Sequence, residues 1–246
     1  MTFSEDDVER YARHLVLSEI GGPGQQALRR ARVLIVGVGG VGAPAALYLA
    51  AAGVGTLGLV DDDTVALSNL QRQVLFTTAD IGRLKVETAA ERLAPLNPGV
   101  ALETFPRRLT LRDAADLVRG FDIVLDGTDD FATRQAVNAA CVAAGKPLVS
   151  GALGRWEGQV GVFTGRPCYQ CLVSEAPPDA ETCARVGVVG ALAGVMGSMA
   201  ALEAIKWIVG AGEPLRGRLL LYDGLRGLAR TVRIAADPAC AVCGER

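Results

Sequence analysis

Short apolar runs alternate with amphipathic segments through the first 150 residues of the chain. The runs are rich in Val, Ile and Leu, which is typical of parallel strands buried on both faces. They span Val33–Val36, Thr56–Val60, Val100–Phe105, Phe121–Leu125 and Leu148–Ser150. Segments with helical character lie between them, at Ala45–Ala52, Lys85–Leu93, Leu111–Val118 and Phe131–Ala144. This alternation predicts an α/β fold with a mostly parallel sheet and helices on both of its faces.

The pattern changes after residue 150. Strand-like stretches at Gln159–Phe163, Arg218–Tyr222 and Thr231–Ile234 lack crossovers between them and predict that antiparallel strands extend the sheet in the C-terminal part. The apolar segment Val186–Leu202 is rich in Gly and Ala and is short for a membrane span. We expect it to be a buried helix packed on the sheet, and we expect no transmembrane segment.

The N-terminal residues are predicted to form a helical arm. Ser4 is placed to cap a helix over Glu5–Leu17, with acidic residues in its first turn. Gly21–Gly24 then break the chain before a short helix, Gln25–Arg30. Because the N-terminus is acidic and polar, no signal peptide is predicted and the cytoplasm is the expected location.

A glycine-rich turn joins the first strand to the helix that follows it. Gly37, Gly39 and Gly42 fit the pattern G-x-G-x-x-G, and Gly40 adds a fourth glycine. Glycine allows a sharp turn and lets a ligand approach the backbone amides, while a helix N-terminus offers unpaired N–H groups and partial positive charge. This strand–turn–helix arrangement is that of a Rossmann-like fold and predicts a nucleotide-phosphate site. The pattern alone does not say which nucleotide binds.

Charged residues follow the next strands. Asp61 comes about 20 residues after the glycines, where a nucleotide-binding unit places the ligand of its ribose hydroxyls. Arg72 and Lys85 are cations that suit the phosphates of a nucleoside triphosphate, although each alone is also common at a protein surface. Asp126–Asp130 end another strand, where a carboxylate beside a triphosphate is expected to hold Mg²⁺.

The six cysteines divide into two pairs and two single residues. Cys168–Cys171 and Cys240–Cys243 are C-x-x-C pairs, and four thiolates would close a tetrahedral structural zinc site. The alternatives are two redox dithiols or disulfides, and the expected location disfavours stable disulfides. Cys141 lies in an alanine-rich segment as a small apolar residue. Cys183 lies in a polar, proline-containing loop, either as an accessible nucleophile or as an incidental residue.

Composition narrows the class of protein. Half of the 246 residues are apolar, which suits a well-buried α/β fold. The formal net charge of −2 and the pI of about 5.6 show no basic surplus, so we expect no nucleic-acid partner. His14 is the only histidine, and a triad mechanism would have to use it.

Taken together, these motifs resemble the ThiF/MoeB/HesA group of adenylyltransferases, bacterial relatives of the ubiquitin-activating enzymes. The resemblance runs from about Tyr11 to Gly244. It is carried by an ordered set that comprises Arg13, Gly37–Gly42, Asp61, Leu67–Gln73, Lys85, Leu125–Asp129, Thr182–Cys183 and both C-x-x-C pairs. We therefore expect one domain over residues 1–246, comprising the helical arm (1–30), a Rossmann-like ATP-binding part (31–150) and a carrier-binding and zinc part (151–246).

The resemblance implies an activity. Enzymes of this group use Mg·ATP to adenylate the C-terminal glycine of a ubiquitin-like sulfur carrier that ends in Gly-Gly, and they release pyrophosphate. The carrier would be MoaD-like or ThiS-like, for molybdenum cofactor or thiamine thiazole biosynthesis. The residues implied to bind the nucleotide are Gly37, Gly39, Gly40, Gly42, Asp61, Asp63, Ser68, Asn69, Leu70, Gln71, Arg72, Lys85, Asp129 and Asp130.

The resemblance also implies individual roles. Asp61 would hold the ribose, Arg72 and Lys85 the phosphates, and Asp129 the Mg²⁺. Arg13 would act across a homodimer interface on the ATP of the partner. The candidate catalytic residues are Arg13, Arg72, Lys85, Asp129 and Cys183.

Two further positions bear on the branch of the family and on the proposed metal site. Cys183 matches a cysteine that can form a covalent link to the carrier in the thiamine branch, and its role here is a hypothesis. Asp130 stands where the family often has asparagine, which adds negative charge beside the proposed metal.

Three other functions stay open from the sequence. An NAD-dependent oxidoreductase would explain the glycine turn but not Arg72, Lys85 or the cysteine pairs. A zinc-stabilised binding module would hold a nucleotide or a carrier without turnover. A relative of the tRNA threonylcarbamoyladenosine dehydratases would keep the fold and act on tRNA, which the lack of basic surplus disfavours.

Overall fold

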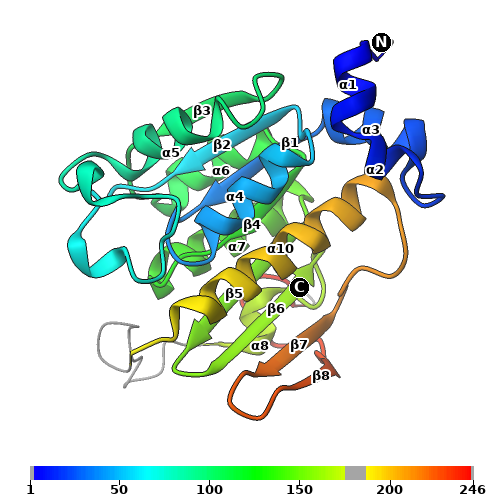
Figure 1. Cartoon of the computed structure of the whole chain (residues 1–246). Coiled ribbons are helices and arrows are strands. Elements are labelled where there is room, and N and C mark those ends of the chain that lie inside the picture. The colour runs from blue at the N-terminus through cyan, green and yellow to red at the C-terminus, as the bar shows by residue number, and fades with distance from the viewer. Residues whose placement is uncertain (1–2, 175–186, 245–246) are drawn as a thin grey trace.

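The computed structural model describes residues 3–174 and 187–244 and is built on an eight-stranded sheet in the order β3-β2-β1-β4-β5-β6-β7-β8 (Figure 1). Neighbours from β3 to β5 in this order are parallel, and those from β5 to β8 are antiparallel. The strands are β1 (Arg32–Val36), β2 (Thr56–Val60), β3 (Ala101–Phe105), β4 (Ile123–Asp126), β5 (Leu148–Gly154), β6 (Glu157–Phe163), β7 (Arg218–Asp223) and β8 (Leu228–Arg233). The predicted α/β fold with an antiparallel C-terminal extension is confirmed.

Helices cover both faces of the sheet, and β1 shows how its residues divide between them. Val33 and Ile35 pack with α3 (Gly21–Arg30), α4 (Gly42–Ala51), α5 (Lys85–Leu93) and α10 (Gly190–Val209). Leu34 and Val36 pack on the other face with α6 (Leu111–Arg119), α7 (Phe131–Ala144) and α8 (Tyr169–Leu172). Because successive side chains of a strand point to opposite faces, an unbroken apolar run supplies both cores.

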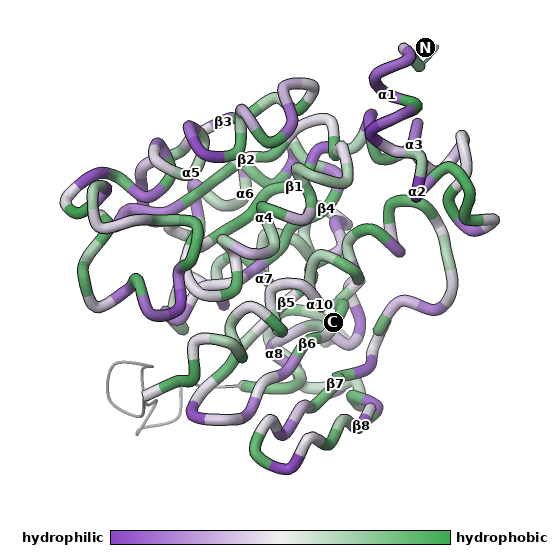
Figure 2. The backbone as a smooth tube through the Cα atoms, viewed as in Figure 1, coloured by the Kyte–Doolittle hydropathy of each residue, from purple (hydrophilic) through white to green (hydrophobic). Residues whose placement is uncertain are grey.

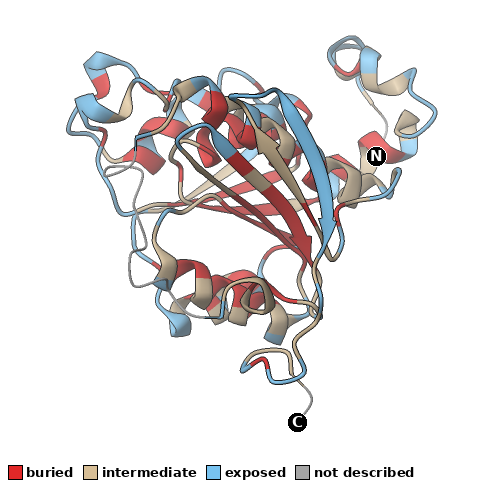
Figure 3. Ribbon diagram, turned by 90° about the horizontal axis from the view of Figure 1, so that it is seen from below, coloured by how far each residue is buried: buried red, intermediate tan, exposed pale blue. Residues whose placement is uncertain are grey.

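Burial is greatest in the central strands of the sheet and falls toward the edge that β8 forms. Every residue of β2 and β4 is buried, whereas every residue of β8 is exposed (Figure 3). The hydropathy of the chain follows the same gradient, with the central strands hydrophobic and α1 (Glu5–Arg10) largely hydrophilic (Figure 2). The antiparallel strands therefore enlarge the sheet without adding a core as closed as that around β1.

The N-terminal arm differs from the single helix predicted over Glu5–Leu17. Ser4 caps α1 as expected, but the helix ends at Arg10, and α2 (Ala12–Leu15) begins after a turn at Tyr11. Tyr11 is 8% exposed and its hydroxyl accepts a hydrogen bond of 2.8 Å from the Asn97 amide. The burial of this side chain against the body of the protein accompanies the break.

The glycine-proline run also behaves differently from its prediction. Gly21–Gly24 begin α3, which runs to Arg30, rather than break the chain before it. Pro23 stands in the first turn of that helix, where the backbone N–H groups have no intrahelical partner, so its missing N–H costs nothing.

The apolar C-terminal helix is longer than predicted. α10 passes Glu203 and Lys206 because the Glu203 carboxylate accepts hydrogen bonds from Lys206 Nζ (2.6 Å) and from the backbone N–H of Leu215 (2.7 Å). By length and composition alone α10 could cross a membrane. It packs instead on α4 and across β5 and β6 (Figure 1), as predicted for a buried helix.

Candidate functional site

A cleft of about 550 Å³ opens at the carboxyl ends of the parallel strands. Its wall is formed by the segments that follow β1, β2 and β4, together with residues of β5. The strand order reverses between β1 and β4, since the chain continues from β1 to β2 on one side and from β4 to β5 on the other. Open α/β sheets bind ligands at this kind of reversal.

The glycine turn forms the floor of the cleft. Gly37 has a φ of +84°, which other residues rarely adopt, and Gly37, Gly39 and Gly40 all line the cavity. Gly42 does not line it; a Cβ there would lie 1.8 Å from the carbonyl oxygen of Gly37. The first three glycines thus present backbone to a ligand, while Gly42 lets α4 start close to the end of β1.

Asp61 lies just beyond β2, beside the glycine turn. Its carboxylate accepts hydrogen bonds from the backbone N–H groups of Val38 (2.8 Å) and Asp63 (2.9 Å). Burial raises the pKa of this carboxyl, while the charge of Lys85 and the two N–H donors act in the opposite direction. The structure therefore holds an acceptor at the position where the sequence predicts the ribose ligand.

Lys85 begins α5 and reaches back to the acidic segment. Its Nζ lies 2.7 Å from Asp63 Oδ2 and 3.9 Å from Asp61 Oδ1. The side chain of Lys85 is 5% exposed and that of Asp63 is 60% exposed. Of the two acidic partners of Lys85, Asp63 is therefore by far the more exposed.

The segment from Leu67 to Gln73 supplies the next wall. Asn69 and Arg72 line the cleft, and Arg72 Nη1 donates to the Ser68 carbonyl (3.0 Å). Ser68, Leu70 and Gln71, which were also predicted to bind the nucleotide, do not line it.

Gln73 is the last residue of the predicted segment Leu67–Gln73, and it lines the cleft. It is 4% exposed, and its Oε1 is the one buried side-chain oxygen without a hydrogen-bond partner within the described part of the chain. A buried, unpaired amide beside a cleft is a candidate ligand contact.

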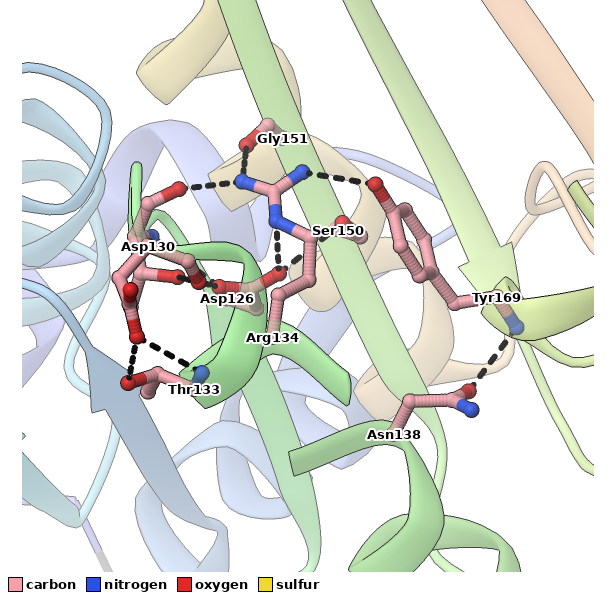
Figure 4. A network of polar contacts seen from close by, with 9 residues as sticks. Asp126, Asp130, Thr133, Arg134, Asn138, Ser150, Gly151 and Tyr169 are labelled. Atoms are coloured by element: carbon pink, nitrogen blue, oxygen red, sulfur yellow. Dashed lines mark hydrogen bonds and ion pairs between the residues drawn. The ribbon is translucent and has the colours of Figure 1, made fainter. Parts of the chain in front are cut away.

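The loop after β4 brings acids to the opposite wall, and its carboxylates do different things (Figure 4). Asp126 is fully buried and pairs with Arg134 Nε at 3.2 Å. Asp130 caps α7; its Oδ2 accepts from the backbone N–H (2.8 Å) and the hydroxyl (2.5 Å) of Thr133, and these hydrogen bonds lower its pKa. Asp129 is exposed, lines the cleft and accepts no hydrogen bond from the described residues.

Three more cationic residues, which the sequence predictions did not include, line the cleft. Arg107 and Arg108 follow β3, and Arg108 Nε lies 3.3 Å from Asp62. Arg134 enters from α7. The charges of Arg107 and Arg108 fit a polyanionic ligand, whereas Arg134 is paired with Asp126. The two arginines after the third strand were visible in the sequence without a motif to mark them.

The four paired cysteines come together away from this cleft, between α8 and the C-terminal turn. The Sγ atoms of Cys168 and Cys240 are 3.7 Å apart, those of Cys171 and Cys243 are 3.3 Å apart, and all four lie within 4.8 Å of one another. A tetrahedral zinc ion with bonds of about 2.3 Å needs sulfur–sulfur edges of about 3.8 Å. The donor set and its spacing fit structural zinc, and the distances are too long for disulfides of about 2.05 Å.

One predicted catalytic residue, Arg13, is not in the cleft. It lies exposed on α2, in the arm that precedes β1, and this arm stands at the amino ends of the parallel strands (Figure 1). Cys183 lies outside the described residues. The structure thus brings Arg72, Lys85 and Asp129 together and leaves Arg13 outside the cleft of its own chain.

Comparisons with known proteins agree with this architecture. A family model described as "ThiF family" matches residues 11–242. The chain is 45% identical to the sulfur carrier protein adenylyltransferase of Thermus thermophilus over 100% of this chain and 94% of that relative. It is 46% identical to the molybdopterin-synthase adenylyltransferase of Escherichia coli over 98% of each chain. The crystal structure of E. coli MccB with MccA-N7isoASN has a TM-score of 0.82 and 26% identity, over 96% of this chain and 75% of that chain.

The cysteine cluster gives a direct prediction. Cys240→Ser removes one of four ligands, so we expect zinc to fall from about one ion per chain to a small fraction, because a structural site needs all four. We expect Tm to fall by about 5–10 °C, which is a loss of a few kcal/mol at this chain length. Metal analysis and a thermal melt measure both.

The matched control is Cys141→Ser. Cys141 is buried in α7, and burial, together with the charge of Asp126, raises its thiol pKa, so it stays protonated and holds no metal. This variant should keep its zinc. A wild-type protein that is fully stable without zinc would refute the four-cysteine site.

Proposed function

The chain belongs to the ThiF family, as its motifs indicated, and we propose that it adenylates the C-terminal glycine carboxylate of a ubiquitin-like sulfur-carrier protein with ATP. The names of the Thermus and E. coli relatives, at 45% and 46% identity over nearly the whole of each chain, support this reaction. The product would be an acyl adenylate, and pyrophosphate would leave.

One observation within the molecule carries the proposal. Arg72 and Lys85 come from separate segments, yet both line the same cleft as Gly37, Gly39 and Gly40, with Asp129 in the wall. A helix N-terminus and two cations suit a chain of phosphates, and an exposed carboxylate with no hydrogen bond from the described residues suits a hard cation. This set of charges fits Mg·ATP better than a nicotinamide dinucleotide.

The residues suggest a division of roles during the reaction. A carboxylate oxygen of the carrier attacks the α-phosphorus, and the bond to the bridging oxygen of the pyrophosphate breaks. Arg72 and Lys85 would neutralise the charge that develops on the departing pyrophosphate, while Asp61 would hold the ribose. Asp129 would hold Mg²⁺, which neutralises phosphate charge when bound.

No side-chain nucleophile is needed for adenylation. The described residues that line the cleft include no His, Ser or Cys. This composition is compatible with adenylation by a substrate carboxylate, because the nucleophile arrives with the carrier. Any later covalent role of Cys183 is a separate step and stays a prediction.

We further propose that the protein acts as a homodimer in which Arg13 of one protomer completes the cleft of the other. Arg13 is exposed on α2, near the amino ends of the parallel strands, whereas the cleft lies at their carboxyl ends. This position supports action in trans. We also propose a cytoplasmic location, where ATP and reduced cysteines are available.

The exchange of radioactive pyrophosphate into ATP tests the reaction. We expect exchange with a purified carrier of the MoaD or ThiS type that ends in Gly-Gly, and none with the same carrier lacking its last glycine. The carrier that supports exchange identifies the pathway. No exchange with any carrier, together with tight NAD binding, would refute the proposal in favour of an oxidoreductase.

Substitutions in the cleft should abolish that exchange without unfolding the protein. We expect Arg72→Ala and Asp129→Ala each to lower its rate by at least about 10²-fold, the loss typical when a group that stabilises transition-state charge is removed. Arg119→Ala is the control, because Arg119 is exposed on α6, outside the cleft, and pairs with Asp116. A normal rate in either cleft variant would refute the role of that residue.

Mixed dimers test whether Arg13 acts in trans. Arg13→Ala and Asp129→Ala homodimers should both be inactive. A heterodimer purified through two different tags should recover about half of the wild-type activity per protomer, because one of its two equivalent sites is intact. A heterodimer as inactive as its parents would place Arg13 in its own cleft, and a fully active Arg13→Ala homodimer would place it outside the reaction.

A further inference from the structure

Helix α7 connects the cleft to the cysteine cluster. Its N-terminus follows Asp129, with Asp130 as its cap, and Arg134 and Asn138 lie one turn apart on the same face. Arg134 is 5% exposed and Asn138 1% exposed, and both side chains point toward β5 and α8 (Figure 4). Figure 4 shows that the contacts of this face extend from the acid loop to Tyr169, which lies between two of the cysteines.

Arg134 joins four separate segments. Its Nε lies 3.2 Å from Asp126 Oδ2 at the end of β4, and Nη2 donates to the carbonyls of Thr128 and, at 3.2 Å, Gly151. Nη1 donates to the Tyr169 hydroxyl (3.5 Å), and the guanidinium carbon lies 5.4 Å from the centre of that ring. Thr128 immediately precedes Asp129, so Arg134 holds the backbone from which the proposed Mg²⁺ ligand projects.

Asn138 makes the corresponding contacts at the cysteine cluster. Its Oδ1 accepts from the backbone N–H of Tyr169 (2.9 Å), and its Nδ2 donates to Cys168 Sγ (3.5 Å). A hydrogen bond to a metal-binding sulfur orients that ligand and tunes the affinity of the site. Asn138 thus fixes the first C-x-x-C turn to the same helix that fixes the acid loop.

We propose that Arg134 and Asn138 are positioning residues that couple the acid loop Thr128–Asp130 to the Cys168–Cys171 turn, so that nucleotide binding and zinc retention support each other. The proposal rests on the proposed function, because it takes the cleft to bind Mg·ATP. Neither residue touches the reacting atoms. Arg134 acts through the placement of Asp129, and Asn138 through the placement of Tyr169 and Cys168.

The planar guanidinium explains why arginine is required at this position. Its donors point in fixed, divergent directions, which lets a single side chain hold acceptors from β4, the acid loop, β5 and α8. Lysine would keep the charge opposite Asp126 but would concentrate its donors at one nitrogen. The charge would then be retained and the connection between segments lost.

Coupling between two sites is reciprocal, so it can be read at either one. The experiment measures the rate at which a chromophoric chelator removes zinc from the full-length protein, with and without Mg·ATP and without carrier. In the wild type we expect Mg·ATP to slow zinc loss by about fivefold or more, the lower end of ordinary coupling between sites. In Arg134→Lys we expect Mg·ATP to change that rate by less than about twofold.

Arg119→Lys is the matched control, since it makes the same substitution on the exposed face of α6 and should keep the protection seen in the wild type. Asn138→Ala breaks the connection at its other end and keeps the test usable if Arg134→Lys does not fold. In Asn138→Ala, zinc loss should be about 10-fold faster or more without nucleotide, and Mg·ATP should no longer slow it.

A merely structural role would raise the rate of zinc loss by the same factor with and without nucleotide. That result in Asn138→Ala or Arg134→Lys would overturn the proposal, as would a wild-type rate that Mg·ATP does not change. ATP affinity measured on the same samples separates the two ideas. If ATP binds and pyrophosphate exchanges but Mg·ATP does not slow zinc loss, only the coupling is refuted. If ATP does not bind, both the proposed function and the coupling are refuted.

Discussion

The cleft depends on a close backbone contact at the reversal of strand order. The glycine turn after β1 and the loop after β4 pass so near each other that a Cβ at Gly127 would lie 2.9 Å from the Gly42 nitrogen. A Cβ at Gly37 would lie 3.0 Å from the nitrogen of Thr128. This approach places the N-terminus of α4 and the acids after β4 on one crevice, within reach of the same phosphate chain. A side chain at any of these glycines would separate the two walls.

The charged residues around this contact divide into buried ion pairs and exposed carboxylates. Asp126 with Arg134, and Asp61 with Lys85, are largely buried pairs, and breaking either would leave an uncompensated charge in the interior. Asp62, Asp63 and Asp129 are exposed. Under the proposed function, a nucleotide would displace the outer carboxylates from Lys85 and Arg108 while the buried pairs stay in place.

The apolar pattern predicted the strands well because β1, β2 and β4 are buried on both faces and carry unbroken hydrophobic runs. The motif residues Asp61, Arg72, Lys85 and Asp129 were also predicted, since each follows a recognisable element. Features that depend on tertiary contacts were harder to predict. The break at Tyr11 accompanies its contact with Asn97, which the local sequence does not show. Arg134 has no local signature; its importance comes from what surrounds it in the fold.

The central claim is that the cleft directs a carboxylate to the α-phosphorus of ATP. It is tested most directly with a carrier whose C-terminal carboxylate carries ¹⁸O, followed by cleavage of the product with hydroxylamine and mass spectrometry of the phosphorus compounds. The account predicts a labelled oxygen in AMP and none in pyrophosphate. Label in orthophosphate, with ADP as the nucleotide product, would show attack at the γ-phosphorus and would contradict it.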